Sequence, residues 1–373
     1  MKRVGFIAWR PFIEDNKYYK EWINEQIVSQ IDEINSVDEL WYISSCKLLG
    51  CIEDYKNFQF YFCEVINKKH IFSLNFKNFR FFLENILPKF DVIVTSQPHY
   101  PFIMLLNKYA KKYGVKTVFI QHGMQVKNES SVVKERLNIL RKKQSLVSSI
   151  ALIKQLFMCL KIDYKVSILT IKNILSKSNA LFFPEYLPKE YRFDYLKVYS
   201  QEEYNKYITK YNKESVEIIL DPDIKLYLNY SGKKYTNKKK YVLYIDDEVI
   251  KDYNQYKKFN KLVDFFNDNN YDFFYLPRAR NDEQPEYDKL NKKIIFLPPR
   301  SINEYIDNAE FIISNWSTLL NLPLYLKKKI LIPYDENIIK YMKEKGYYQK
   351  FKNSNNVIFL NLQREKEWKS MLL

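Results

Sequence analysis

The chain has 373 residues and a mass of 45.3 kDa, which is enough for two domains that each bury a hydrophobic core. Hydrophobic residues make up 46% of the sequence, and this proportion excludes an intrinsically disordered chain. The 60 Lys and Arg residues exceed the 44 Asp and Glu residues, for a net charge of +16, but Lys is abundant throughout, so the excess is no specific sign of a nucleic-acid partner.

The first half of the sequence alternates short apolar runs with helical patterns, which is typical of a parallel sheet covered on both faces. The predicted strands are Val4–Trp9, Leu40–Ser44, Phe58–Phe62, Val92–Thr95, Val118–Ile120, Ala180–Phe183 and Leu196–Tyr199, and the clearest helices are Asn78–Ile86 and Phe102–Tyr113. The first apolar run is too short for a signal-peptide core. The four cysteines show neither metal-ligand spacing nor a disulfide framework, so we expect a cytoplasmic protein.

A basic, amphipathic segment, Arg141–Lys177, interrupts this alternation. Residues 131–180 contain ten Lys or Arg and two Asp or Glu, a net charge of +8, which is half of the excess of the chain. One interpretation is one or two amphipathic helices on an anionic membrane surface. The other is an ordinary pair of packed helices with solvated lysines. No run of about 18 uncharged apolar residues occurs, so we expect no transmembrane helix.

The polar segment Leu226–Lys240 indicates a linker, and the alternation restarts after it. We therefore predict an α/β protein with two Rossmann-like domains: residues 1–228, with the basic insert at about 131–180, and residues 229–373. The cleft between such domains, at the carboxyl ends of the strands, is the expected ligand site. The second domain has predicted strands at Tyr241–Ile245, Asp272–Leu276, Ile294–Leu297, Phe311–Ser314, Ile330–Pro333 and Val357–Leu360, and predicted helices near Tyr256–Asn267, at Ser301–Asn308, at Thr318–Leu326 and through Tyr347.

Polar clusters follow four of the predicted strands directly. In the first domain, Gln121-His122-Gly123 ends the strand Val118–Ile120. An imidazole titrates near neutral pH, so His122 suits a general base, and Gly123 lets the backbone approach a ligand. A structural histidine would also fit this position. His99, after the preceding strand, is an alternative base at the same edge.

The other three clusters follow strands of the second domain. The acidic triplet Asp246–Glu248 could bind ribose or acceptor hydroxyls, or form an ordinary acidic turn, and no metal-ligand spacing accompanies it, so we predict no metal site. Arg278 and Arg280 offer planar donors for a phosphate. Ser317 and Thr318 begin a helix whose N-terminus would hold an anion, although Ser and Thr also cap helices without ligands. Together these residues indicate a ligand that carries phosphate.

The two Rossmann-like halves, the Gln-His-Gly sequence and the late segment "FIISNWSTLLNLPLYLKKKILIP" resemble a GT-B glycosyltransferase. Within that fold, the second half is similar to bacterial surface-sugar transferases that use CMP-activated nonulosonic acids, the sialyl-, polysialyl- and Kdo-transferase relatives. Their acidic pair falls on Asp246-Asp247, with Glu248 where Gly is expected. Their His-Pro pair falls on Leu276-Pro277, without the histidine, and their serine pair falls on Ser317-Thr318. Gln-His-Gly also resembles the Trp-His-Gly of teichoic-acid glycerophosphotransferases, which share the architecture and use CDP-glycerol.

This resemblance implies a glycosyltransferase that builds a bacterial capsule or lipooligosaccharide without metal or cofactor. The N-terminal domain would bind the acceptor, with His122 or Asp247 as the base and with Gln121, Gly123 and His99 near the acceptor or the cleft. The C-terminal domain would bind the nucleotide-sugar donor, with a CMP-sugar of sialic acid or a related nonulosonate favoured. The implied donor-binding residues are Asp246, Glu248, Arg278, Arg280, Ser314, Ser317 and Thr318.

The expected partners are the nucleotide-sugar donor, a glycan or lipid-linked acceptor and the inner membrane surface, to which a cytoplasmic enzyme would bind peripherally. A nucleic-acid partner is not expected, because the aromatic residues lie mostly on apolar faces and no recognition motif appears. Two other functions share the architecture: a CDP-glycerol or CDP-ribitol polyol-phosphate transferase, and a sugar-nucleotide 2-epimerase. An epimerase would act on a soluble substrate and would not need the basic insert.

Overall fold

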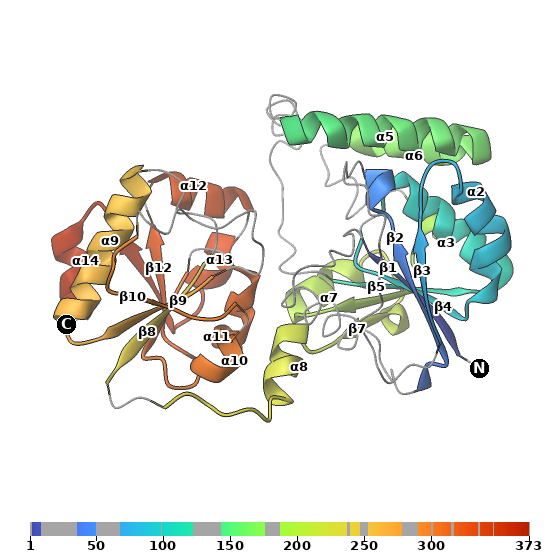
Figure 1. Ribbon diagram of the computed structural model, residues 1–373. Coiled ribbons are helices and arrows are strands. Elements are labelled where there is room, and N and C mark those ends of the chain that lie inside the picture. The colour runs from blue at the N-terminus through green and yellow to red at the C-terminus, as the bar shows by residue number, and fades with distance from the viewer. Residues whose placement is uncertain are drawn as a thin grey trace. The chain divides into compact units, whose positions relative to one another are not determined.

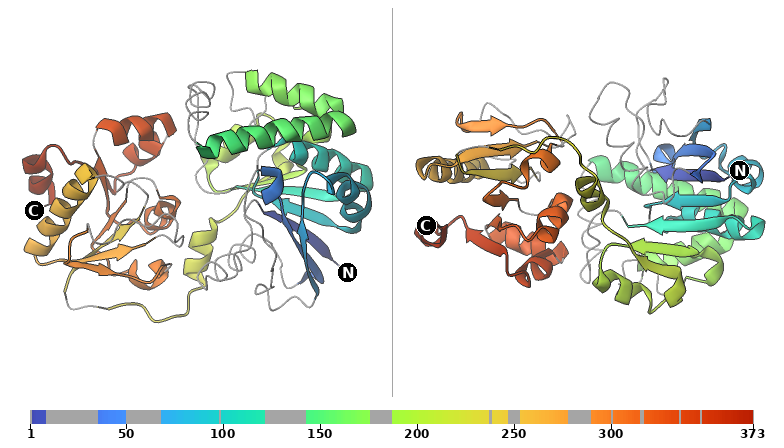
Figure 2. Two further views of the ribbon diagram at one scale, coloured as in Figure 1. Left: turned by 45° about the horizontal axis from the view of Figure 1, so that its top comes forward. Right: turned by 90° about the horizontal axis from the view of Figure 1, so that it is seen from below.

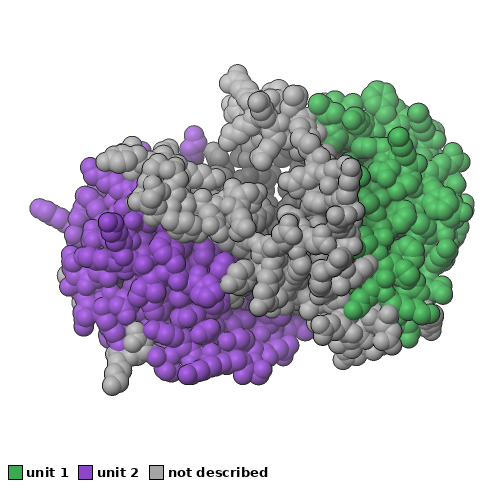
Figure 3. All heavy atoms as spheres, in the orientation of Figure 1, with its two compact units in different colours: residues 1–220 green, residues 221–373 purple. Residues whose placement is uncertain are grey.

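The structure is a computed structural model (Figure 1, Figure 2). It describes residues 2–8, 36–49, 68–97, 99–121, 143–175, 187–236, 239–246, 253–277, 290–299, 301–314, 317–334, 336–345 and 347–372. The chain divides into two compact units, Met1–Leu220 and Asp221–Leu373 (Figure 3).

The first unit contains a seven-stranded sheet in the order β3-β2-β1-β4-β5-β6-β7, with parallel neighbours throughout. Its strands are β1 (Arg3–Ala8), β2 (Glu39–Ser44), β3 (Lys68–Ser73), β4 (Val92–Thr95), β5 (Lys116–Ile120), β6 (Tyr195–Val198) and β7 (Val216–Ile218). Its helices are η2 (Cys46–Leu49), α2 (Phe79–Phe81), η3 (Phe82–Ile86), η4 (Leu87–Lys89), α3 (Pro101–Tyr113), α5 (Lys143–Ile162), α6 (Tyr164–Leu175), η5 (Lys189–Tyr191), α7 (Gln201–Tyr207) and η6 (Lys213–Ser215). The strand order reverses between β1 and β4.

Both faces of this sheet are buried. Along β1, Ile7 packs in a hydrophobic cluster that includes residues of α3, whereas Val4 and Phe6 belong to a second cluster. The residue between Val4 and Phe6 is Gly5, where an added Cβ would lie 2.5 Å from Ile93 Cδ1, so a larger residue would force the Ile93 side chain to move. Burial on both faces explains why the central strands read as continuous apolar runs.

The sequence pattern does not predict β3 and β7, which are the two edge strands. β3 begins with Lys-Lys-His and β7 has glutamate at its centre, since an edge strand is partly exposed and tolerates polar residues. The predicted strands Phe58–Phe62 and Ala180–Phe183 lie outside the described residues.

One prediction about the cysteines is wrong. Cys46, in η2, is disulfide-bonded, contrary to the expectation that the cysteines form no disulfide, and its partner lies outside the described residues. Spacing along the chain does not report which thiols meet in space, which is the condition for a disulfide. Cys159 is free and buried.

The second unit contains a six-stranded parallel sheet in the order β10-β9-β8-β11-β12-β13, which reverses between β8 and β11. Its strands are β8 (Tyr241–Ile245), β9 (Asp272–Leu276), β10 (Ile294–Phe296), β11 (Phe311–Ile313), β12 (Ile330–Tyr334) and β13 (Val357–Asn361). Its helices are α8 (Pro222–Leu228), α9 (Tyr253–Asp268), α10 (Ile302–Tyr305), η9 (Thr318–Leu320), α11 (Asn321–Tyr325), α12 (Glu336–Lys345), α13 (Tyr347–Lys352) and α14 (Glu365–Leu372). The two sheets confirm the predicted α/β fold with two Rossmann-like domains.

The division between the units precedes the sequence-predicted boundary after residue 228. Helix α8 packs on α11, and Asp221 Oδ2 accepts a hydrogen bond of 2.8 Å from Asn321 Nδ2. Beyond α8, Tyr235 N donates to Glu304 O at 2.9 Å. The predicted linker Leu226–Lys240 therefore belongs largely to the second unit, because its aromatic residues pack there.

Helices α5 and α6 form a hairpin that is joined at Asp163 and packs on α3 (Figure 1, Figure 2). The segment Arg141–Lys177, for which the sequence predicts one or two helices, thus contains two. None of the helices in the described ranges combines the length and the apolar character that a membrane crossing requires.

Candidate functional site

The second sheet carries polar residues at its topological switch point, the place where the strand order reverses. The neighbouring strands there are β8 and β11, with Tyr244 paired to Ile313. Asp246 directly follows β8 and Ser314 directly follows β11. Ligands of open α/β sheets bind outside the carboxyl ends of the strands at such a point. The fold thus places two predicted donor-site residues, Asp246 and Ser314, on adjacent strand ends.

Both residues are buried, with 5% of Asp246 and none of Ser314 exposed. Their backbones extend the sheet: Asp246 N donates to Leu276 O at 3.1 Å, and Ser314 N donates to Leu331 O at 3.2 Å. A carboxylate held here can accept hydrogen bonds from ligand hydroxyls, and a serine hydroxyl can donate or accept.

Pro277 directly follows β9, which is the neighbour of β8, so Pro277 lies at the same edge of the sheet as Asp246. Arg278 and Arg280 follow Pro277 in the sequence. Six of the predicted site residues lie outside the described residues, so their predicted roles stay predictions; they are His122, Gly123, Asp247, Glu248, Arg278 and Arg280.

The helix predicted at Thr318–Leu326 differs from the expectation. The chain forms the three-residue 3-10 turn η9 and then the five-residue helix α11, which contains Pro323. Ser317 Oγ accepts a hydrogen bond of 3.3 Å from Leu319 N. Because a helix macrodipole needs several aligned turns, the predicted anion site cannot depend on one here, and Ser317 can contribute only its hydroxyl and local N–H groups.

In the first sheet, the side chain of Gln121 fixes the end of β5. Its Nε2 donates to Glu203 Oε1 at 2.5 Å, and its Oε1 accepts a 3.0 Å hydrogen bond from Tyr199 N. Glu203 also accepts from Ser200 Oγ at 2.8 Å. Gln121 therefore ties β5 to the turn between β6 and α7, and sets the point from which the chain enters His122.

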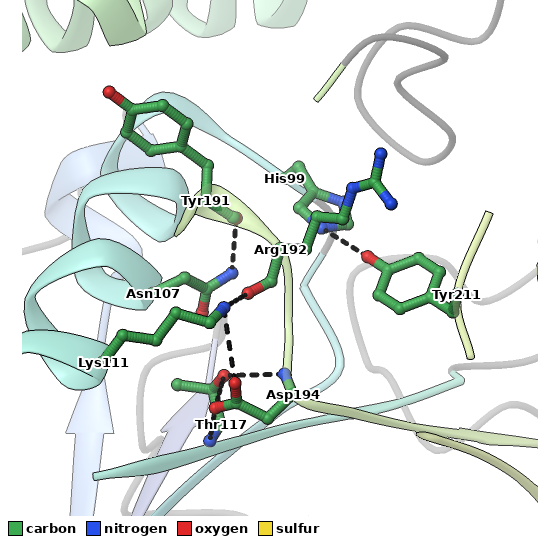
Figure 4. A network of polar contacts seen from close by, with 8 residues as sticks. All are labelled: His99, Asn107, Lys111, Thr117, Tyr191, Arg192, Asp194 and Tyr211. Atoms are coloured by element: carbon green, nitrogen blue, oxygen red, sulfur yellow. Dashed lines mark hydrogen bonds and ion pairs between the residues drawn. The ribbon is translucent and has the colours of Figure 1, made fainter. Parts of the chain in front are cut away.

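The alternative base, His99, is packed as a core residue. Its side chain is 4% exposed, and its ring centroid lies 4.7 Å from that of Phe193. Its Nε2 lies 3.3 Å from Tyr211 Oη (Figure 4). Burial raises the pKa of the Tyr211 hydroxyl, so this group stays neutral. A histidine enclosed by two aromatic rings is better suited to position the chain after β4 than to exchange protons with a substrate.

A polar network beside His99 joins β5 to β6 (Figure 4). Asp194 Oδ2 accepts hydrogen bonds from Thr117 N at 2.9 Å and from Thr117 Oγ1 at 2.8 Å. Lys111 Nζ, from α3, lies 3.4 Å from Asp194 Oδ1 and also donates to Arg192 O. Burial lowers the pKa of Lys111 despite Asp194. These contacts fix the register of the strand that ends in Gln121.

Sequence reasoning missed a polar group at the switch point of the first sheet. Thr95 Oγ1 donates to Ile7 O at 3.1 Å and Ser45 Oγ donates to Ala8 O at 2.9 Å. Gln97 Nε2 donates to Ser45 Oγ at 2.6 Å, and the buried Gln97 Oε1 accepts no hydrogen bond from the residues that the structure describes. These residues also end or follow predicted strands, so the rule that selected His122 would have found them.

Among the residues that the structure describes, no three His, Cys, Asp or Glu side chains gather as a metal ion would require. No family model matches the sequence, and no curated protein is similar to it in sequence.

Solved structures share the fold. A UDP-N-acetylglucosamine 2-epimerase superposes with a TM-score of 0.51 at 8% identity, covering 100% of this chain and 87% of its own. The S. aureus MnaA–UDP structure gives 0.50 at 10% identity, with coverages of 100% and 88%. The glycotransferase of kitacinnamycin gives 0.50 at 8% identity, with coverages of 97% and 87%. At such identities the likeness establishes the shared fold, which is the GT-B fold with two Rossmann-like domains.

Proposed function

We propose that the protein is a glycosyltransferase of bacterial surface polysaccharide, which transfers a sugar from a nucleotide-activated donor to a glycan acceptor. The observation that carries this proposal is the pair of buried polar residues, Asp246 and Ser314, at the switch point of the second sheet. At the carboxyl ends of neighbouring parallel strands, a carboxylate and a serine hydroxyl are groups to which a ligand with hydroxyl groups can hydrogen-bond.

The donor belongs to the second unit. Asp246 would accept hydrogen bonds from its hydroxyl groups, and Ser314 and Ser317 would hydrogen-bond its phosphate side. Arg278 and Arg280 follow the adjacent strand β9, and their guanidinium groups can bind a phosphate in bidentate fashion. The match of the acidic pair and the serine pair to the CMP-nonulosonate transferases favours a CMP-sugar.

The acceptor belongs to the first unit. His122, which follows the fixed Gln121, would take the proton of an acceptor hydroxyl, with Asp247 as the alternative base. Gln97 Oε1 offers a buried acceptor that an incoming hydroxyl group would satisfy. As the acceptor oxygen bonds to the donor carbon, the bond from that carbon to the phosphate oxygen breaks. Its electron pair stays on the phosphate, where Arg278 and Arg280 stabilise the added charge.

A surface-glycan transferase works where lipid-linked acceptors are, so we place the protein at the cytoplasmic face of the inner membrane. The basic hairpin α5–α6 supports this location. It also separates the proposal from a sugar-nucleotide 2-epimerase, whose substrate is soluble.

A thermal-shift screen of CMP, CDP, UDP and GDP tests the proposal, because a nucleotide that binds only the folded state raises the melting temperature. We expect the largest shift from CMP, and transfer from a CMP-sugar only when an acceptor is present. A shift with CDP, together with release of CMP from CDP-glycerol, would instead indicate the polyol-phosphate transferase. Conversion of a UDP-sugar without any acceptor would indicate the epimerase and refute the proposal.

A further inference from the structure

The α5–α6 hairpin exposes an apolar face. On α5, the exposed side chains are Ile150, Ile153, Phe157 and Leu160, and Phe157 is 63% exposed. On α6 they are Tyr164, Ile168 and Ile171. Seven of the 16 large hydrophobic residues that are exposed in the described ranges thus lie on two helices, a concentration that scattered surface residues do not produce.

These side chains form one face, distinct from the face that packs on the core. They are spaced by three and four residues, so on α5 they span an arc of about 80° at 3.6 residues per turn. The opposite side of α5 is buried and includes Ala151, Gln155 and Cys159; that of α6 includes Val166 and Thr170. The hairpin therefore packs on the rest of the first unit through one face and exposes a second, apolar face.

The hairpin is held firmly on the first unit. Asp163, between the helices, accepts hydrogen bonds from Lys108 Nζ at 2.6 Å and from Tyr191 Oη at 2.8 Å. Gln155 Nε2 donates to Leu48 O at 2.8 Å. The exposed apolar face thus belongs to a hairpin that is anchored to the first unit, and loose packing of the hairpin does not explain the exposure.

Positive charge borders this face. Lys154 and Lys161 lie beside the apolar arc of α5, and Lys165 and Lys172 beside that of α6, and all four are exposed. Between residues 143 and 175 the only acidic residue is Asp163, which faces inward. An apolar stripe bordered by these four exposed lysines matches the chemistry of an anionic lipid surface, where acyl chains lie below phosphate groups.

We infer that the outer face of α5–α6 docks on an anionic lipid bilayer, with its apolar side chains below the headgroups and its lysines at the lipid phosphates. A second copy of the chain fits less well, because a self-complementary contact would bring lysines against lysines. The apolar side chains supply most of the affinity and the lysines select anionic lipid. This inference deepens the proposed location and is independent of the donor, so it can be tested without catalysis.

The test is co-sedimentation of the full chain with vesicles of phosphatidylcholine alone or with one quarter phosphatidylglycerol. The apolar variant is Phe157→Ser with Ile168→Ser, and its matched control is Ile218→Ser, at an exposed apolar position on β7. Each buried apolar side chain contributes on the order of tenfold, so the apolar variant should lose about 100-fold in partitioning to anionic vesicles. The control should bind as the unaltered protein does.

The charge variant is Lys154→Gln with Lys161→Gln, and its control is Lys213→Gln on η6. Each lysine near an anionic surface is worth about fivefold, so this variant should lose about 25-fold at low salt and little at 0.5 M salt, where screening is strong. Melting temperatures of all variants check folding, and CMP-dependent stabilisation checks the donor site separately.

Equal binding of the apolar variant and the unaltered protein would overturn the inference. So would equal loss in the Ile218→Ser control, or equal binding to both kinds of vesicle. Sedimentation equilibrium supplies the last arm: a dimer that the apolar variant converts to monomer would show that a second copy covers this face.

Discussion

Replacing Asp163 by Ala should detach the hairpin from the first unit. The Asp163 side chain is 9% exposed, and its Oδ2 accepts from both Lys108 and Tyr191. Lys108 is 38% exposed, so its ion pair contributes about 1 kcal/mol. Tyr191 is buried, so its hydroxyl loses its acceptor at a cost of about 1–3 kcal/mol. The sum predicts a loss of about 2–4 kcal/mol in the stability of the hairpin.

Hydrogen exchange is the suitable assay, because a two-unit chain need not unfold in one step. Amides of α5 and α6 should exchange about 30- to 700-fold faster in Asp163→Ala, which is the predicted free-energy range converted at about 1.4 kcal/mol per tenfold. The matched control is Asp268→Ala, because Asp268 is 70% exposed and lies 3.7 Å from Lys293 in an exposed pair. If both substitutions change exchange equally little, Asp163 does not anchor the hairpin.

The same carboxylate gives the anchor a pH dependence. Burial acts to raise the pKa of Asp163, but the hydrogen bonds from Lys108 and Tyr191 outweigh it and hold the pKa below its ordinary value. The stabilisation is therefore complete above the unfolded value of about 3.9 and is lost as the pH falls through the folded value. The difference in hairpin stability between the unaltered protein and Asp163→Asn, measured by hydrogen exchange, should stay constant from about pH 7 to pH 5 and shrink below about pH 4.

His122→Ala should lower turnover by about 10²–10⁴-fold with an unchanged melting temperature. His99→Ala should instead cost about 1–3 kcal/mol of stability, because it opens the packed core beside Phe193. Turnover and melting temperature are measured on the same preparations, and an inactive but stable His99→Ala variant would make His99 the base. Arg278→Lys and Ser317→Ala should each weaken nucleotide binding by calorimetry, and unaltered affinity in both would place the donor elsewhere. Gly114→Ala should cost about 1–2 kcal/mol in denaturant unfolding, because Gly114 has φ +72° and a Cβ there meets no atom, so the penalty is conformational; an unchanged midpoint would contradict this.

The fold was predictable where burial dictates the sequence. β8 and β9 match the predicted ranges because every position but Asp272 is buried and apolar or aromatic. The edge strands β3 and β7 were not predictable, since half-exposed positions accept lysine and glutamate. The attachment of α8 to α11 was not predictable for a related reason: α8 is short, and its contact with α11 depends on Asp221 and Asn321, which are far apart in sequence.

The candidate site was predictable only in part. The rule that ligands bind at strand ends selected Asp246, and the resemblance to known transferases implied Ser314; the structure places the two residues on neighbouring strands. The same rule could not distinguish His99 from His122, because the enclosure of His99 by Phe193 and Tyr211 depends on residues about a hundred positions away. The sequence did reveal the charge of the hairpin. Its exposed apolar face could be identified only from the structure, which shows the face of the hairpin that packs on the first unit.

The anchor at Asp163 has a consequence for which acceptors can react. Helix α3 starts at the carboxyl edge of the first sheet, just after β4, and its Lys108 holds the hairpin through Asp163. A bilayer bound by the hairpin would therefore lie at one fixed height from that edge. Under the proposed function, a glycan acceptor would then react only when its terminal sugar stands at that height above the lipid, and shorter or longer acceptors would not react.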